Sequence, residues 1–260
     1  MSVSFINKVL DNGKTIFYAW FESMHTRIDI VICNQSEDFS KNTIDLIYNE
    51  LHRIEQLVNR FDPSSELYRL NQTAAIHPVT VSPELFHIIA DCIDYYEKTS
   101  GCFDVTVNSL ESYRNGIKGI VCDLRNYSIS YKNPAIKIDL GGFAKGYALD
   151  KSIKILKNNQ MTDALVNFGN SSVFAIGNHP SGCGWKITLP TSTREQPESV
   201  VLHDECLTTS GNEEAHLHIL SPFDGQYIKA GKPVSVVTKD ATSGEVFSTA
   251  LFVSRGIGNE

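Results

Sequence analysis

The chain has 260 residues, of which 42% are hydrophobic and 20% are charged, and its formal net charge is −7. This composition is typical of a globular protein and excludes a largely disordered chain. Lysine and arginine form no basic stripe, which argues against nucleic acid as a partner. The six cysteines are scattered without a C-x-x-C pair, so we expect buried, reduced thiols and no zinc site.

The N-terminal sequence has no basic segment followed by an apolar one, which is the pattern of a signal peptide. No apolar run approaches the roughly 18 residues that a membrane helix requires. These features predict a cytoplasmic protein without a membrane anchor. An acidic protein of this kind must neutralise any polyanionic ligand locally, with a metal ion or a few placed cations.

The first half of the chain predicts two strands and then two helices. Ile16–Glu22 and Arg27–Cys33 alternate or run apolar, as strands do, and are separated by a short turn. Pro83 after Ser82 marks the start of a helix that ends before Gly101. An earlier amphipathic helix is indicated by apolar residues at spacings of three and four, namely Ile44, Ile47, Leu51, Ile54 and Val58.

The second half of the chain predicts mostly strands, with one helix at Phe143–Asn158 and a last helix at Ser243–Val253. The predicted strands are Tyr127–Tyr131, Ala135–Ile138, Ala164–Asn167, Ser172–Ile176, Trp185–Leu189, Val200–Leu202, Leu217–Ile219 and Ser235–Thr238. Because several strands follow one another without helices between them, we expect an α+β fold with a mixed or antiparallel sheet and packed helices. We expect one compact domain over residues 1–260.

The segment Asp139–Ala148 has the pattern of a strand-to-helix turn that holds a phosphate. Gly141 and Gly142 allow the backbone to approach a ligand, and the free N–H groups of the following helix favour an anion. Lys145 is predicted in the first turn of that helix, where the helix dipole disfavours a cation, so its presence there favours a functional role. An ordinary β–α turn with a solvated lysine explains the pattern equally well.

Two further segments combine aromatic, acidic and histidine residues. Phe103-Asp104 follows Gly101, and a helix-ending glycine before a core phenylalanine and a capping aspartate is the more common interpretation. His218 lies on a predicted strand that leads into a Pro–Gly turn, where a structural histidine is more common than a catalytic one. His216 lies two residues earlier, so a His-x-His metal pair is an alternative.

The last helix places Glu245 and Thr249 four residues apart, and therefore on one face. A carboxylate and a hydroxyl in that arrangement suit a hard cation such as Mg²⁺. Alternatively, Glu245 is stabilised by the helix dipole in the first turn, and Thr249 bonds back to its own helix.

Taken together and in chain order, these segments resemble the ApbE family of FAD:protein FMN transferases. The family pattern contains M-G-T, S-E-L, G-x-F-D-x-T, D-L-G-G-x-A-K-G-Y-A, L-V-N-x-G-G-D, S-G, H-x-x-x-P-x-T-G, S-V-T-V and A-D-A-L-S-T-A. The matching segments here are Met24-His25-Thr26, Ser65-Glu66-Leu67, Gly101–Thr106, Asp139–Ala148, Leu165–Ser171, Ser210-Gly211, His218–Gly225, Ser235–Val237 and Gly244–Ala250. Each motif alone is weak, but their common order over most of the chain is specific.

The resemblance implies an ApbE-like, T-fold-related α+β domain that transfers FMN from FAD to a threonine hydroxyl of an acceptor flavoprotein and releases AMP. FAD is then a substrate and Mg²⁺ a cofactor. The resemblance implies a proton-handling role for His218 and an FAD site formed by Met24, Phe61, Cys102, Phe103, Asp104, Asp139, Lys145 and Ile219. It implies a metal held by the Gly142 carbonyl with Glu245, Ser248 and Thr249.

Several positions depart from the family pattern and describe a divergent, short member. Glu245 stands where the family has aspartate, and Asn170 and Ser171 replace the Gly-Asp of G-G-D. His25 replaces the glycine of M-G-T, and Asp224 replaces the threonine of P-x-T-G. These departures leave two alternative functions, an FAD-binding protein that has lost transfer activity and a metal-dependent FAD hydrolase that forms FMN and AMP.

Overall fold

The computed structural model describes residues 3–11, 13–109, 116–189, 198–212, 217–229 and 231–257. The chain forms two compact units. The first comprises Met1–Ile54, Lys145–Ser210 and Lys232–Ser248, and the second comprises Glu55–Ala144, Gly211–Gly231 and Thr249–Glu260. One domain over residues 1–260 stays a prediction.

The first unit is built on a seven-stranded sheet with the strand order β1-β2-β3-β7-β8-β11-β12. Every neighbouring pair in this sheet is antiparallel. The strands are β1 (Ser4–Val9), β2 (Thr15–Ser23), β3 (Thr26–Cys33), β7 (Ala164–Phe168), β8 (Ser172–Ile176), β11 (Glu205–Ser210) and β12 (Val234–Thr238).

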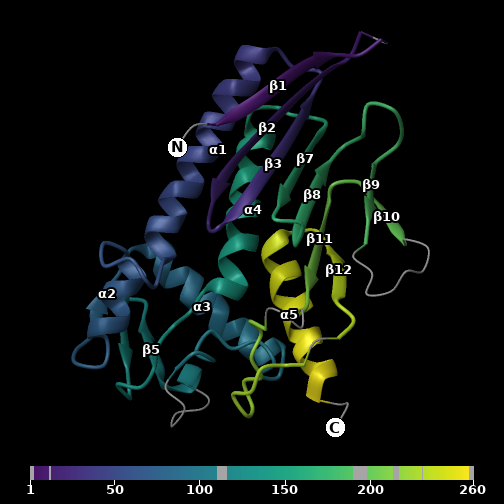
Figure 1. Ribbon diagram of the computed structural model, residues 1–260. Coiled ribbons are helices and arrows are strands. Elements are labelled where there is room, and N and C mark those ends of the chain that lie inside the picture. Colours follow the sequence, from purple (N-terminus) through teal and green to yellow (C-terminus); the bar gives the residue numbers. More distant parts are fainter. Residues whose placement is uncertain are drawn as a thin grey trace. The chain divides into compact units, whose positions relative to one another are not determined.

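Alternation of side chains along β2 and β3 gives the sheet its main core face, with Phe17, Ala19 and Phe21 buried on β2. Three helices contribute residues to this unit, α1 (Glu37–Val58), α4 (Gly141–Asn158) and α5 (Ala241–Ile257). Figure 1 shows α1 and α4 running beside the strands. The predicted apolar stripe of α1 is confirmed, because all five of its residues are buried.

The other face of the sheet carries a second, smaller core. The hairpin β9 (Trp185–Thr188) and β10 (Ser199–Leu202) packs there through Trp185 and Leu202 against Cys33, Ala175 and Leu207. The indole N–H of Trp185 donates to the carbonyl of Ile176 at 3.0 Å, so the buried ring leaves no polar group unpaired. Parts of β8 and β11 are therefore buried on both faces.

Among the described residues, two α-helices and a small sheet lie wholly within the second unit. The helices are α2 (Glu66–Thr73) and α3 (Pro83–Lys98). The antiparallel sheet has the strand order β4 (Val79–Thr80), β6 (Ser128–Tyr131) and β5 (Ile120–Asp123). The 3₁₀ helix η1 (Gly116–Gly119) directly precedes β5 in the chain. Ser65 and Ser82 cap α2 and α3 by accepting bonds from Tyr68 N–H and Leu85 N–H. The predicted start of α3 is confirmed.

The predicted α+β class with an antiparallel sheet is confirmed, but two predicted strands are wrong. At residues 135–138, the side chain of buried Asn71 bonds both the N–H and the carbonyl of Ile138, each at 2.8 Å. At residues 217–219, the Asn212 side chain accepts a hydrogen bond from the Ile219 N–H at 2.9 Å and donates one to the Ile219 carbonyl at 3.1 Å. In both places a side chain bonds backbone groups that strand pairing would use, although the Ile219 carbonyl also accepts the Ile228 N–H at 3.0 Å.

The sequence interpretation also missed the strands β1, β4, β5 and β11 and the helix α2. Helix α4 begins at Gly141, two residues before its predicted start. Lys145 is therefore the fifth residue of the helix, and its predicted position in the first turn is wrong. The dipole argument for a functional role of Lys145 loses its basis, since the effect falls off within the first turn.

Candidate functional site

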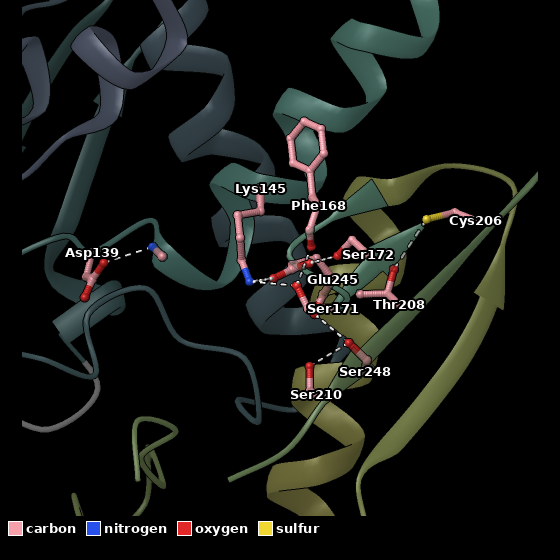
Figure 2. Close-up of polar contacts among 11 residues, drawn as sticks. Asp139, Lys145, Phe168, Ser171, Ser172, Cys206, Thr208, Ser210, Glu245 and Ser248 are labelled. Atoms are coloured by element: carbon pink, nitrogen blue, oxygen red, sulfur yellow. Dashed lines mark hydrogen bonds and ion pairs between the residues drawn. The ribbon is translucent and has the colours of Figure 1, made fainter. Parts of the chain in front are cut away.

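A buried carboxylate and a lysine form the centre of the polar cluster in the first unit. Lys145 on α4 places its Nζ atom 3.5 Å from Oε1 of Glu245 on α5, and donates a hydrogen bond of 3.1 Å to the Ser171 hydroxyl. The Ser172 hydroxyl donates to the other oxygen of Glu245, Oε2, at 2.7 Å. Figure 2 shows these side chains pointing toward one another.

Burial makes these contacts necessary. Glu245 is only 5% exposed and Ser172 is fully buried, so an unpaired carboxylate at this position would carry a large desolvation cost. The lysine and the serine hydroxyl offset that cost from opposite oxygens of the same group. The cluster can therefore hold one negative charge in the interior and present one half-buried cation beside it.

Ser248, a predicted metal ligand, lies one turn after Glu245 and is fully buried. Its hydroxyl donates to the Glu245 carbonyl at 3.2 Å and shares a hydrogen bond of 2.7 Å with the hydroxyl of Ser210 at the end of β11. Ser248 thus lies in the same cluster as Glu245 and ties α5 to the sheet.

The relative positions of α4 and α5 within this unit are fixed by backbone contacts. Gly146 lies so close to the start of α5 that a Cβ atom there would be 2.5 Å from the Ala241 carbonyl oxygen. One turn further along α4, the Asp150 carboxylate accepts bonds from the N–H groups of Ala241 at 2.7 Å and Thr242 at 2.9 Å. This cap satisfies the first free N–H groups of α5 and sets Glu245 one turn later, beside Lys145.

Asp150 is itself half-buried. Burial raises the pKa of its carboxyl group, while the hydrogen bonds from Thr242 and Ala241 act in the opposite direction. A carboxylate at a helix N-terminus also interacts favourably with the helix dipole.

In the second unit, the Asp139 carboxylate has three polar partners. Its carboxylate accepts bonds from the Gly141 N–H at 2.9 Å and from the Asn108 amide at 2.6 Å, and it pairs with Arg60 at 3.2 Å. The bond from the Gly141 N–H caps the first turn of α4, and Figure 2 shows the Asp139 side chain that accepts it. The ring of Phe61, which is 71% exposed, lies 4.4 Å from the Arg60 guanidinium.

The segment containing Phe103 and Asp104 packs beside Asp139, because the Asp139 N–H donates to the Val105 carbonyl at 2.7 Å. Asp104 accepts bonds from the N–H and hydroxyl of Thr106 at 2.7 and 2.6 Å, and burial raises its carboxyl pKa. Phe103 is buried and lies 3.5 Å from the position of a Cβ on Gly142. The core phenylalanine and the capping aspartate of the common interpretation are both observed.

Cys102, a predicted FAD contact just before this segment, is half-buried. Burial raises the pKa of its thiol, so the neutral thiol is the form present near neutral pH.

His218 and Ile219 lie on an irregular segment of the second unit that Asn212 organises. The Asn212 Oδ1 atom accepts bonds from the N–H groups of His218 at 3.0 Å and Ile219 at 2.9 Å. His218 is exposed and Ile219 is half-buried. His216, the possible second member of a His-x-His pair, lies outside the described residues.

Met24 lies in the β2–β3 turn of the first unit, where Met24 and His25 have φ values of 52° and 59°. This turn and the β7–β8 turn lie at the same end of the strands, since the Gly169 N–H donates to the Arg27 carbonyl at 3.0 Å. Ser171, which accepts the hydrogen bond from Lys145, lies in the β7–β8 turn.

The structure therefore gathers the predicted site residues in two sets. Lys145, Glu245 and Ser248 meet in the first unit, and Phe103, Asp104, Asp139 and Gly142 lie together in the second. Thr249, in the second unit, is the residue that follows Ser248 on α5. Sequence reasoning missed the partners of these sets, which are Arg60, Asn108, Asp150, Ser172 and Asn212. Ser172 and Asn212, which directly follow the matched motifs Leu165–Ser171 and Ser210-Gly211, carried a signal by position.

Comparison with known proteins identifies the family. The sequence model of the ApbE family matches residues 24–256, and the chain belongs to this family. A protein named FAD:protein FMN transferase from Chlamydia muridarum is 26% identical over 245 residues, covering 82% of this chain and 75% of the relative. A protein of the same name from Klebsiella pneumoniae is 25% identical over 247 residues, with the same coverage of 82% and 75%.

Solved structures support the fold. The ApbE protein from Thermotoga maritima has a TM-score of 0.81 and 26% identity, and the match covers 93% of this chain and 87% of that one. The flavin transferase ApbE from Vibrio cholerae has a TM-score of 0.80 at 20% identity, covering 99% and 90%, and is similar in fold. The resemblance, the fold class and the enzyme class predicted from the sequence, a transferase, are confirmed.

Proposed function

We propose that this chain transfers FMN from FAD to a threonine hydroxyl of an acceptor flavoprotein in a Mg²⁺-dependent reaction that releases AMP. The donor and the transferred group are those in the names of its relatives. The observation that carries the proposal is the buried Glu245 carboxylate beside Lys145, in a chain that the family model matches from residue 24 to residue 256.

The reaction is a displacement at phosphorus. The threonine oxygen forms a new bond to the FMN-side phosphorus of FAD, the bond from that phosphorus to the bridging oxygen breaks, and AMP leaves with the bridging oxygen. The hydroxyl proton passes to a base. Catalysis of such a step consists mainly of positioning and of compensating negative charge.

The lysine of the cluster supplies part of that compensation. Lys145 is half-buried, and its ammonium group is the cation beside Glu245, so it can donate to the anionic oxygens of the pyrophosphate. This role also answers how a chain with a net charge of −7 tolerates a polyanionic substrate.

The residues predicted for the metal fit Mg²⁺ in donor type. Glu245 offers a carboxylate, Ser248 and Thr249 offer hydroxyls and Gly142 offers a carbonyl, all oxygen donors. Among the described residues, no group of three or more His, Cys, Asp or Glu side chains is arranged so that it could hold a metal ion. Glu245 is the one carboxylate of the proposed set. When bound, Mg²⁺ would neutralise charge on the phosphate oxygens.

The remaining roles follow the sequence prediction. His218 is exposed, and we assign it the acceptance of the threonine proton. We assign FAD contacts to Met24, Phe61, Cys102, Phe103, Asp104, Asp139 and Ile219. Among the described residues, no helix combines the length and apolar character needed to cross a bilayer, and a cytoplasmic location stays a prediction.

The test is an in vitro flavinylation assay. The protein is incubated with FAD, Mg²⁺ and an acceptor flavoprotein, and the denatured products are separated by electrophoresis. A fluorescent acceptor band, absent when the target threonine is replaced by alanine and weaker with Lys145→Ala or Glu245→Ala, is the expected result. FAD binding without a band for several cognate acceptors would support the non-transferring alternative. FMN and AMP formed without acceptor, detected by chromatography, would support the hydrolase.

A further inference from the structure

Both oxygens of the Glu245 carboxylate are already engaged. Oε2 accepts the Ser172 hydroxyl at 2.7 Å, and Oε1 lies 3.5 Å from the Lys145 ammonium. The two contacts differ in kind. The Ser172 bond is short and fully buried, whereas the Lys145 contact is longer and involves a side chain that is 31% exposed.

Lys145 has a second partner that requires no negative charge. Its ammonium group donates to the Ser171 hydroxyl at 3.1 Å, a shorter contact than the one with Glu245. The lysine can therefore leave Oε1 and keep one hydrogen bond. Glu245, by contrast, would lose its only cationic partner among the described contacts, and a buried carboxylate does not remain unpaired without cost.

A divalent cation and Lys145 consequently compete for Oε1. Two positive charges at one carboxylate oxygen repel each other, and the repulsion is strong because the site is buried. A polyanion bound at Lys145 would remove this conflict, since it gives the ammonium group a new partner and adds negative charge that favours the cation.

We propose that Lys145 acts as a gate on Glu245, so that a divalent metal and the pyrophosphate of FAD bind cooperatively, with Ser172 as the positioning residue that holds the carboxylate while its partner changes. This inference rests on the proposed function, because it takes FAD and a divalent metal as the ligands. It adds an order to their binding, in which the anion makes the carboxylate available to the metal.

The experiment measures the coupling between the two ligands at equilibrium. FAD affinity is determined from flavin fluorescence with and without Mn²⁺, and Mn²⁺ affinity is determined from the free-ion paramagnetic resonance signal with and without FAD. A titration of FAD with Mn²⁺ in the absence of protein is subtracted. If the two ligands are coupled, the ratio of FAD affinities with and without Mn²⁺ must equal the ratio of Mn²⁺ affinities with and without FAD. We expect FAD to raise Mn²⁺ affinity by about tenfold or more, within the range of known coupled sites.

The decisive variant is Lys145→Gln. Without the ammonium group, Mn²⁺ should bind more tightly in the absence of FAD than it binds to the wild type, and the coupling ratio should fall several-fold. An unchanged coupling ratio in Lys145→Gln, or equal Mn²⁺ affinity of the wild type with and without FAD, overturns the proposal. Weakened FAD binding in the variant does not disturb this comparison, because each ratio is taken within one protein.

Two controls separate the gate from general effects. Lys239 pairs with Glu205 at 3.0 Å on the surface of the same unit, and Lys239→Gln removes the same charge without touching the cluster. Its coupling ratio should equal that of the wild type. Ser172→Ala should weaken Mn²⁺ binding with and without FAD alike, provided that its melting curve shows a folded protein. These binding ratios do not depend on an acceptor, so a failed flavinylation assay and a failed gate give different results.

Discussion

The close approach of α4 to the start of α5 predicts a large effect for a small substitution, Gly146→Ala. The added Cβ would lie 2.5 Å from the Ala241 carbonyl oxygen and 2.9 Å from the Thr242 Cα. Both neighbours are backbone atoms, so no flexible side chain can yield. Overpacking of this kind costs about 1–3 kcal/mol, whereas alanine in place of a helical glycine contributes roughly 1 kcal/mol in the favourable direction. We expect a net loss of up to about 2 kcal/mol in the free energy of unfolding.

The assay is urea denaturation followed by circular dichroism, with Gly142→Ala as the matched control. A Cβ on Gly142 would meet only the Phe103 ring edge, at 3.5 Å, which is an ordinary contact. This variant should be neutral or slightly more stable than the wild type. If Gly146→Ala were as stable as Gly142→Ala, the reasoning that backbone contact fixes α5 against α4 would be refuted. A displaced α5 should also weaken Mn²⁺ binding in Gly146→Ala.

Three further predictions concern stability and reactivity. Burial raises the pKa of Asp104 in the native state above its ordinary value of 3.8. Between the pKa of the unfolded state and the higher pKa of the native state, the native state binds more protons, so the free energy of unfolding of the wild type falls as pH rises through that window. Asp104→Asn lacks this dependence, and urea titrations at several pH values should show its stability relative to the wild type rising with pH; the opposite slope contradicts the assignment. Asn212→Ala leaves several backbone groups near His218 unpaired and should lose about 2–4 kcal/mol, with early proteolysis at residues 217–229; unchanged stability contradicts its organising role. Cys183, the exposed cysteine, should react first with a thiol reagent, and buried Cys206, whose pKa burial raises to about 12, should react only on unfolding; equal rates would disprove the burial pattern.

The elements that the sequence predicted correctly are those whose pattern is local. Helix α1 carries a regular apolar stripe, and α3 begins with a serine cap and a proline, so periodicity and capping were sufficient. Strand β1 was missed because nearly all of its residues are exposed, which leaves no alternation to detect. The two wrong strands have an apolar pattern typical of a strand, but the side chains of Asn71 and Asn212, which lie outside that pattern, bond the backbone groups of Ile138 and Ile219.

The candidate site divides in the same way. Lys145, Asp139 and Glu245 lie in motifs that the sequence order made specific, and the structure gives each of them polar partners. The partners themselves could not be read from the chain. Arg60 reaches Asp139, and Asp150 reaches the first residues of α5, over separations in sequence that no periodicity covers.

The cap that Asp150 places on α5 has a consequence for how this site can vary. Because main-chain bonds to Ala241 and Thr242 set where the helix begins, the backbone at position 245 is held independently of the side chain that it carries. The length of the side chain at position 245 therefore determines which groups its carboxylate contacts. Glutamate contacts Lys145 and Ser172, and an aspartate on the same backbone would be one methylene too short for both contacts. Because the start of α5 is fixed in this way, glutamate and aspartate can replace each other at position 245 without a change in the packing of the surrounding core.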